Sequence, residues 1–269
     1  MTLPSPRETL LALRDQTPLV HCITNYVAMN STANLLLAAG ASPAMLHAQE
    51  EVAEFTAIAG ALSINIGTLS TPWAEAMQLA AQSAQAHAVP WVLDPVAVGA
   101  TRLRQQTCLS LLAYQPSVIR ANASEIMALS GLAHQGRGVD ATVSTDDATQ
   151  AAITLARRYH CVVAMTGATD IVTDGQSLYR LTGGHPLMPR VTTLGCGLSA
   201  LVAGFVAANR HAPLAATLGA LTYFNLAGSH AGQQAEGPGS FYVALLDTLY
   251  SLTADDLPAL PHSETLHVG

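Results

Sequence analysis

Charge is scarce in this chain. Only 11% of its 269 residues are Asp, Glu, Lys or Arg, and the formal net charge is -7 at pH 7. Neutralising the phosphates of a nucleic acid requires clustered basic side chains. Runs of like charge, low-complexity tracts and internal repeats are missing as well. The composition therefore argues against a nucleic-acid partner.

Long uninterrupted hydrophobic runs are also missing. The most apolar stretch, "LSALVAGFVAANRHAPLAATLGALTYF", is broken by Asn, Arg, His and Pro. Its unbroken pieces of about 12 residues are too short to span a bilayer. Charges interrupt the apolar residues of the opening "MTLPSPRETLLALRDQ", so no signal peptide is expected. We expect a cytoplasmic protein with no membrane partner.

The chain also lacks cysteines and histidines at metal-ligand spacing, and it lacks the phosphate-binding P-loop motif. The four cysteines are scattered, and the ten histidines form no HxH or HxxxH pair. We interpret the cysteines as reduced thiols, and a structural metal is not expected. No GxxxxGK[ST] sequence occurs, so a P-loop enzyme is excluded.

What the chain does have is an alternation of short apolar runs and longer amphipathic ones. We expect strands at residues 18–23, 42–46, 61–67, 89–96, 117–122 and 161–167, and a β-hairpin at 170–184 around Asp174-Gly175. We expect helices at residues 5–16, 25–40, 49–59, 71–88, 100–115, 123–131, 145–160, 196–210, 213–232 and 240–252. This order predicts an α/β fold whose parallel sheet is covered on both faces.

Helix ends and the domain boundary are read from the same pattern. Residues 5–8 form a capping box, Thr71 is expected to cap its helix, and Gly40 and Gly131 are expected to end theirs. No linker is visible, so one domain over residues 1–269 is predicted, with a disordered tail at 261–269.

Polar residues and glycines gather where the predicted strands end. In an open parallel sheet, ligands bind beyond the carboxyl ends of the strands. The residues at or just after these ends are Asn25, Met45, Gly67, Asp94, Arg120, Asn122, Glu125 and Thr166. Taken singly, Asp94 is compatible with a plain strand end and Asn122 with a plain helix cap. Their joint placement favours a site.

The chemistry of this set has one theme. Asp94 and Glu125 supply oxygen ligands of the kind that Mg²⁺ takes, and Arg120 supplies a fork of donors for phosphate. The glycine-flanked helix start at residues 195–197 can present backbone N–H groups to an anion. A metal, a guanidinium and oriented amides together stabilise a transferring phosphoryl group.

At these residues the sequence resembles the hydroxyethylthiazole kinase family of the ribokinase-like superfamily, from about residue 5 to 252. The motifs are "HCITNYV", "GASPAM", "LSINIGTL", "VLDPVAVGAT", "IRANASEI" and "TLGCGLSALVAGF". The resemblance implies a three-layer α/β/α fold with a mostly parallel sheet. It implies transfer of the γ-phosphoryl group of ATP, with Mg²⁺, to the primary alcohol of 4-methyl-5-(2-hydroxyethyl)thiazole in thiamine biosynthesis or salvage. It also implies a homotrimer with thiazole pockets at the subunit interfaces.

The resemblance further assigns roles by motif. Asn25, Met45, Gly67 and Thr193 match substrate-binding positions; Arg120, Asn122 and Thr166 match ATP-binding positions; Asp94 and Glu125 match acidic groups near Mg²⁺; Gly195, Cys196 and Gly197 match the catalytic anion hole and proposed base. Two departures stand out, because many relatives have glycine at the positions of Ala121 and Thr193. We expect the side chain of Thr193 to narrow the substrate pocket or to shift the substrate preference.

Cys196 stands where most ribokinase-like enzymes have aspartate. The helix amides are expected to lower the pKa of its thiol and favour the thiolate. Phosphoryl transfer has a loose transition state, so a modest base or a residue that orients the hydroxyl suffices. The alternative is a small side chain chosen because the helix start is tightly packed.

Other functions stay open at this point. A kinase for hydroxymethylpyrimidine or pyridoxal is the nearest alternative. A cysteine acyl transferase or hydrolase would use Cys196 as nucleophile but leaves the acids and the arginine without a role. A thiazole- or thiamine-binding regulator on an inactive kinase fold is the non-enzyme alternative.

Overall fold

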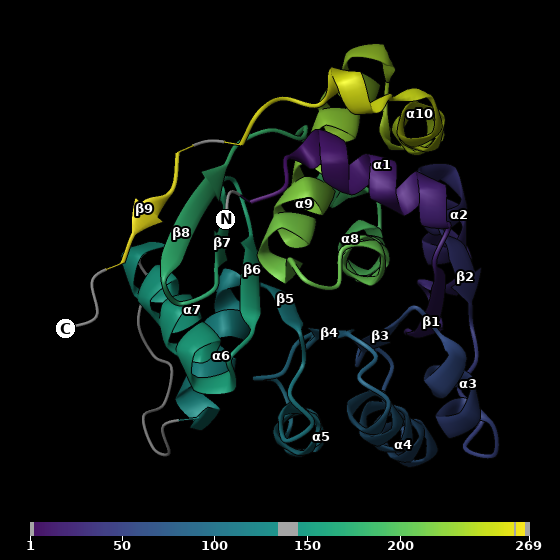
Figure 1. Cartoon of the computed structure of the whole chain (residues 1–269), viewed down its shortest axis with the longest axis vertical. Coiled ribbons are helices and arrows are strands. Elements are labelled where there is room, and N and C mark those ends of the chain that lie inside the picture. The colour runs from purple at the N-terminus through teal and green to yellow at the C-terminus, as the bar shows by residue number, and fades with distance from the viewer. Residues whose placement is uncertain (1–2, 134–144, 261, 267–269) are drawn as a thin grey trace.

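The computed structural model describes residues 3–133, 145–260 and 262–266. A sheet of nine strands runs through them in the order β2-β1-β3-β4-β5-β6-β7-β8-β9 (Figure 1). The strands are β1 Leu19–Ile23, β2 Ser42–Ala44, β3 Ala61–Asn65, β4 Trp91–Asp94, β5 Val118–Asn122, β6 Val162–Thr166, β7 Asp170–Thr173, β8 Ser177–Leu181 and β9 Glu264–Thr265. Pairs from β2 to β6 are parallel, and β7 to β9 continue the sheet antiparallel.

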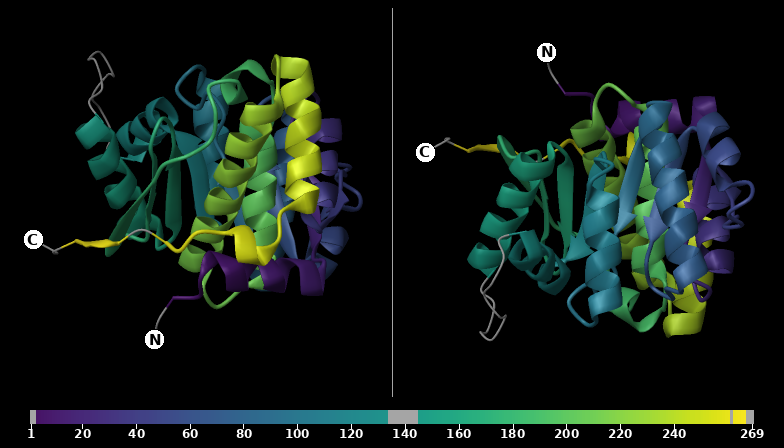
Figure 2. Two further views of the ribbon diagram at one scale, coloured as in Figure 1. Left: turned by 90° about the horizontal axis from the view of Figure 1, so that it is seen from above. Right: turned by 90° about the horizontal axis from the view of Figure 1, so that it is seen from below.

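Helices cover both faces of the sheet, which gives the three layers (Figures 1 and 2). One layer holds α1 Pro6–Gln16, α2 Met29–Ala39, α8 Leu194–Ala208, α9 Pro213–Gln234 and α10 Pro238–Ser251. The other holds α3 Val52–Ile58, α4 Thr71–Ala86, α5 Arg102–Leu112, α6 Ala123–Ala133 and α7 Thr145–Tyr159. Short 3₁₀ helices follow at Met188–Arg190 and Ala254–Asp256.

Strand residues alternate between two hydrophobic cores. In β4, Val92 packs into the core under α8 and α9, while Trp91 and Leu93 pack into the core under α4 and α5. Helices cover both faces, so β4 is apolar on both sides until Asp94 at its end and does not alternate with polar residues. Helix α8 is apolar nearly all round because it lies between the sheet and the helices α1, α2 and α9. Its N-terminus therefore has a fixed place beside the strand ends.

The structure confirms several local predictions and corrects others. The Ser5 capping box is present, Gly40 ends α2 in the left-handed region, and the hairpin turns at Gly175. Thr71 is the first residue of α4 and Ser70 precedes it as the cap position, so the expected Thr71 cap is wrong. Helix α6 runs through Gly131 to Ala133, because glycine is tolerated inside a helix that tertiary packing holds.

The carboxyl-terminal segment also differs from its prediction. Glu264–Thr265 pair with β8, where a disordered tail was expected, and the Arg180 guanidinium contacts Glu264 Oε1 at 2.9 Å. Residues 261 and 267–269 of that predicted tail lie outside the described residues. Within the described ranges, no helix has the length and apolar character needed to cross a membrane. The cytoplasmic location stays a prediction.

Candidate active site

The polar residues that follow the parallel strands do converge at one edge of the sheet. Asn25 follows β1, Asp94 ends β4, Arg120 lies in β5 and Thr166 ends β6. The N-terminus of α8, with Cys196 in its first turn, faces them. Segments that are far apart in sequence thus meet at the predicted place.

A chain of amide hydrogen bonds joins the cysteine to the buried acid. Asn25 Nδ2 donates to Cys196 Sγ at 3.2 Å and to Asn65 Oδ1 at 2.9 Å. Asn65 Nδ2 in turn donates to Asp94 Oδ2 at 2.7 Å, and the Ser199 hydroxyl donates to the same oxygen at 2.8 Å. The carboxylate requires donors, so both amide groups have a fixed orientation.

Asp94 is the most perturbed acid of the site. It is 1% exposed, and burial raises its pKa to about 6, although the nearby Arg120 charge and the Ser199 and Asn65 hydrogen bonds oppose the shift. Its Oδ2 lies 3.9 Å from Arg120 Nη1, while Oδ1 has no hydrogen-bond partner among the described residues. A buried carboxylate oxygen without a partner suits a cation or a bound water.

Arg120 provides the positive charge of the site. The chain contains no lysine, so every one of its basic residues is an arginine. Arg120 Nη2 donates to Thr166 Oγ1 at 2.5 Å, which holds the guanidinium across the ends of β5 and β6. A Cβ on Gly195 would lie 2.8 Å from Arg120 Nη1, so a side chain there would displace the guanidinium. The guanidinium and the first turn of α8 are thereby kept in contact.

The first turn of α8 offers backbone donors, with one correction to the prediction. Gly197 N–H donates to the Thr193 carbonyl at 2.9 Å as the first hydrogen bond of the helix. Gly197 therefore cannot supply an amide to the anion hole, and the candidate donors are the N–H groups of residues 194–196. Gly197 serves packing instead, since a Cβ there would collide with the Leu35 side chain of α2.

Asn122 and Glu125 form a reciprocal cap on α6. Asn122 Oδ1 accepts from Glu125 N–H at 2.9 Å, and Glu125 Oε2 accepts from Asn122 N–H at 3.0 Å. Glu125 Oε1 also accepts from Ala97 N–H at 2.9 Å, which ties α6 to the loop after β4. The Asn122 and Glu125 side chains thus form a helix cap in this structure. Each oxygen keeps a further lone pair for a water or a metal-bound water.

The two acids fit the way Mg²⁺ is usually held. No group of three or more His, Cys, Asp or Glu side chains that could hold a metal occurs in the described ranges. Mg²⁺ keeps several waters and takes only one or two carboxylates plus substrate phosphates. Asp94, with its unpartnered Oδ1, and Glu125 are therefore a suitable pair.

The Cys196 thiol does not behave as predicted. Burial raises its pKa, the Asp94 charge raises it further, and the hydrogen bond from Asn25 opposes the shift. The expected thiolate is therefore wrong for the free protein, because desolvation and a neighbouring acid outweigh the favourable contacts. Cys196 is a neutral thiol that can orient a hydroxyl group.

Of the predicted substrate-side positions, Asn25 contacts this thiol directly, and the others lie after β2, after β3 and just before α8. Gly67 N–H donates to Asn65 Oδ1 at 2.9 Å, and a Cβ on Gly67 would lie 2.8 Å from Asn25 Nδ2. Met45 follows β2 and packs partly buried against the core under α8. The Thr193 hydroxyl lies 2.5 Å from Ser31 Oγ, and its φ of 71° is in the left-handed region that favours glycine.

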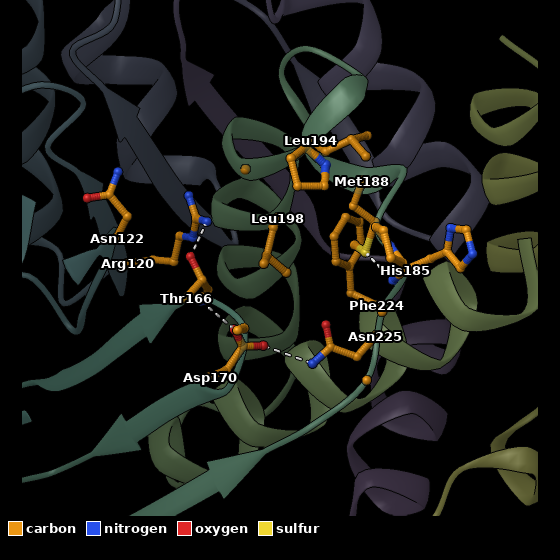
Figure 3. A pocket seen from close by; sticks show the side chains of 17 residues that line it. Arg120, Asn122, Thr166, Asp170, His185, Met188, Leu194, Leu198, Phe224 and Asn225 are labelled. Atoms are coloured by element: carbon orange, nitrogen blue, oxygen red, sulfur yellow. Dashed lines mark hydrogen bonds between the residues drawn. The ribbon is translucent and has the colours of Figure 1, made fainter. Parts of the chain in front are cut away.

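A cavity of about 720 Å³ opens beside Arg120 and the first turn of α8 (Figure 3). Arg120, Asn122, Thr166 and Gly195 line one end of it. The other end is lined by the loop after β8 and by α9, with Pro186, Met188, Phe224 and Asn225. One end is therefore polar and the other mostly apolar, which suits an elongated anionic ligand with an aromatic group.

Comparison with known proteins agrees with this geometry. The sequence matches the Hydroxyethylthiazole kinase family over residues 10–255. The chain belongs to the hydroxyethylthiazole kinase family. It is 54% identical over 248 residues to "Hydroxyethylthiazole kinase" of Rhizobium rhizogenes, with 92% of each chain covered.

Solved structures support the fold. The hydroxyethylthiazole kinase protein from Pyrococcus horikoshii superposes with a TM-score of 0.88 at 40% identity, covering 97% of this chain and 99% of that one. A ribokinase-like superfamily protein from Enterococcus faecalis superposes with a TM-score of 0.62 at 12% identity, covering 90% and 89%. The predicted ribokinase-like α/β/α fold is confirmed.

Sequence reasoning assigned no role to four residues that hold the side chains of the site in place. Asn65 links Asn25 to Asp94, and Ser199 holds Asp94 from α8. Ser199 lies three residues after Cys196, so helical spacing could have placed it on the same side. Arg104 donates to the carbonyls of Ile66, Gly67 and Val96, and Asn225 contacts Asp170. No local sequence pattern predicts the contacts of Arg104 and Asn225.

Proposed function

We propose that this protein transfers the γ-phosphoryl group of ATP to the primary alcohol of 4-methyl-5-(2-hydroxyethyl)thiazole in thiamine biosynthesis or salvage. The observation that carries the proposal is the convergence of Arg120 and the first turn of α8 at one end of the cavity, with the buried Asp94 Oδ2 3.9 Å from Arg120 Nη1. The family and the curated relatives' names supply the thiazole alcohol.

The phosphate end does its work by charge and position. The Arg120 guanidinium and the N–H groups of residues 194–196 stabilise charge on the transferring group. Asp94 and Glu125 would hold Mg²⁺, directly or through water, and the bound ion would neutralise phosphate charge. The alcohol oxygen bonds to the γ-phosphorus as the bond to the ADP oxygen breaks.

Cys196 orients the alcohol in this mechanism. A neutral thiol accepts or donates a weak hydrogen bond, and Asn25 fixes the position of its sulfur. The alcohol proton leaves late, to water or to an oxygen of the transferred phosphoryl group, because the transition state is loose and the alcohol oxygen becomes acidic only as it bonds to phosphorus. A strong base is not needed for the step.

We further propose that the acceptor side is completed in a homotrimer. Tyr26 and Val27 directly follow Asn25, and they are 61% and 62% exposed in the single chain. Leu37 on the adjoining α2 is 59% exposed. Large apolar side chains exposed beside a ligand site are typical of a surface that a second subunit covers.

A coupled assay of ADP release tests the function. The panel is the thiazole alcohol, hydroxymethylpyrimidine and pyridoxal, each with and without Mg²⁺. We expect Mg²⁺-dependent turnover with the thiazole alcohol, at a kcat/KM at least tenfold above the other two. Turnover of another alcohol alone would transfer the assignment to that alcohol, and no turnover with any would reject it.

A further inference from the structure

Asn225 of α9 presents a fixed hydrogen-bond acceptor to the cavity. The residue is 9% exposed and lines both the 720 Å³ cavity and an adjoining cavity of about 290 Å³. Its Nδ2 donates to Asp170 Oδ2 at 2.8 Å. Its Oδ1 accepts no hydrogen bond from any described residue and points away from Asp170 into the cavity (Figure 3).

Asp170 fixes which end of the amide faces the cavity. The Asp170 carboxylate is 6% exposed, and its Oδ1 accepts from Gly167 N–H at 2.9 Å. Its Oδ2 then needs a donor, which only the NH₂ end of the Asn225 amide can provide. The backbone of Asn225 is held as well, because its carbonyl accepts from Gly184 N–H at 3.0 Å.

His185 also lines this end of the cavity, and its ring Nδ1 already accepts from Leu187 N–H at 3.3 Å. Pro186, Met188 and Phe224 supply apolar surface, whereas Arg120 and Gly195 lie at the opposite end. A nucleotide with its phosphates at Arg120 would place its base at the apolar end. The Asn225 carbonyl is then positioned to read the edge of that base.

We propose that Asn225 Oδ1 accepts the 6-amino group of adenine and thereby selects ATP over 6-oxo purine nucleotides. This inference rests on the proposed function, since it requires a nucleoside triphosphate in the cavity. A 6-oxo group is itself an acceptor, so it would meet the Asn225 oxygen without a proton between them. Two buried acceptors in contact lose hydrogen bonds to water and gain none.

Asp170→Asn gives a reversal that a purely structural role would not produce. The new amide oxygen must accept from Gly167 N–H, which leaves the new NH₂ group facing Asn225. Asn225 then turns its oxygen toward residue 170 and its NH₂ toward the cavity. The cavity would present a donor in place of an acceptor, and this favours a 6-oxo purine.

The experiment measures kcat/KM for ATP, ITP and 2′-deoxy-ATP, and binding of ADP and IDP by calorimetry. Wild type should prefer ATP over ITP at least tenfold. Asp170→Asn should bring the ATP-to-ITP ratio to one or below, and Asn225→Leu should lower ATP use about tenfold and leave a ratio near one. Asp174→Asn, the same chemical change in the distant β7–β8 turn, should leave the wild-type ratio unchanged.

The outcomes separate this inference from the proposed function. Wild type that neither binds nor uses any of these nucleotides would reject the proposed function and this inference with it. Wild type and folded variants that share one ATP-to-ITP ratio would reject the inference alone. Loss in Asn225→Leu that disappears with 2′-deoxy-ATP would assign Asn225 to the ribose and also overturn it. Thermal unfolding confirms that each variant is folded.

Discussion

The part of the site that binds the phosphates (the phosphate end) and the part that binds the alcohol (the acceptor end) are built differently. At the phosphate end, side chains hold one another: Arg120 binds Thr166, and Asp94 accepts from Asn65 and Ser199. At the acceptor end, Tyr26 and Val27 are mostly exposed beside the fixed Asn25 and Cys196. The first end is complete within one chain, whereas the second is open. Transition-state charge needs preorganised partners, and a pocket wall can come from a neighbour.

The largest effect is expected at the phosphate end. Arg120→Gln removes the charge that neutralises the transferring group, so kcat/KM should fall about a thousandfold. Arg120→Lys should recover only part of this loss, because it lacks the forked donors that reach Thr166. Arg180→Gln, at an exposed ion pair with Glu264, is the matched control and should keep wild-type kinetics. A folded Arg120→Gln protein with full activity would contradict the phosphate role.

Stability should respond to pH in opposite ways at the two ends. Asp94, with a pKa raised to about 6, contributes stability that is present below about pH 4 and lost as pH rises through 6. His21 lies in β1, the strand that leads to Asn25; burial lowers its pKa to about 4, and its ring Nε2 lies 3.0 Å from the Leu46 carbonyl. Its contribution is present above pH 6.5 and is lost as pH falls through 4.

Each contribution is about 3 kcal/mol at most, and the two offset each other in the wild-type protein. Variants separate them. Between pH 4 and 7, the unfolding free energy of Asp94→Asn should rise relative to wild type, and that of His21→Gln should fall relative to wild type. Urea unfolding at several pH values measures both. Differences from wild type that do not change with pH would show that neither group is perturbed.

The open acceptor end gives the third prediction. Val27→Asp places a charge on a side chain that is exposed in one chain but covered in the proposed trimer. We expect dissociation of the trimer and a KM for the alcohol at least tenfold higher, with nucleotide affinity within twofold of wild type. Leu109→Asp, which also places an acid on an exposed apolar side chain, here in α5, is the control. Light scattering reports the assembly, and an unchanged oligomer with unchanged kinetics would reject the shared pocket.

The smallest effect is expected at Thr193, the residue before α8 whose hydroxyl lies against Ser31 of α2. Its φ of 71° is unfavourable for a β-branched residue, so Thr193→Gly should stabilise the protein by about 1 kcal/mol, less the lost contact with Ser31. Removing the side chain should also raise the relative rate with larger alcohols. Thermal unfolding and the alcohol panel measure both changes. A less stable variant with an unchanged panel would mean that the Ser31 contact outweighs the strain.

Much of this arrangement could be predicted from the sequence. Strand ends, helix caps and the glycines at 195 and 197 are local patterns, and parallel topology brings such ends together. Local patterns could not predict how burial and contacts between distant residues balance one another. The Cys196 pKa depends on burial beside Asp94, and Gly197 is a packing residue because Leu35 lies against it. The contacts from Asn65 and Asn225 likewise depend on neighbours distant in sequence.

A crystal structure with Mg²⁺ and a non-hydrolysable ATP analogue tests the proposed placement of the phosphates most directly. We expect the γ-phosphate within hydrogen-bond distance of the Arg120 guanidinium and the N–H groups of residues 194–196, with the metal beside Asp94. A nucleotide bound with its phosphates away from Arg120 and the start of α8 would contradict it.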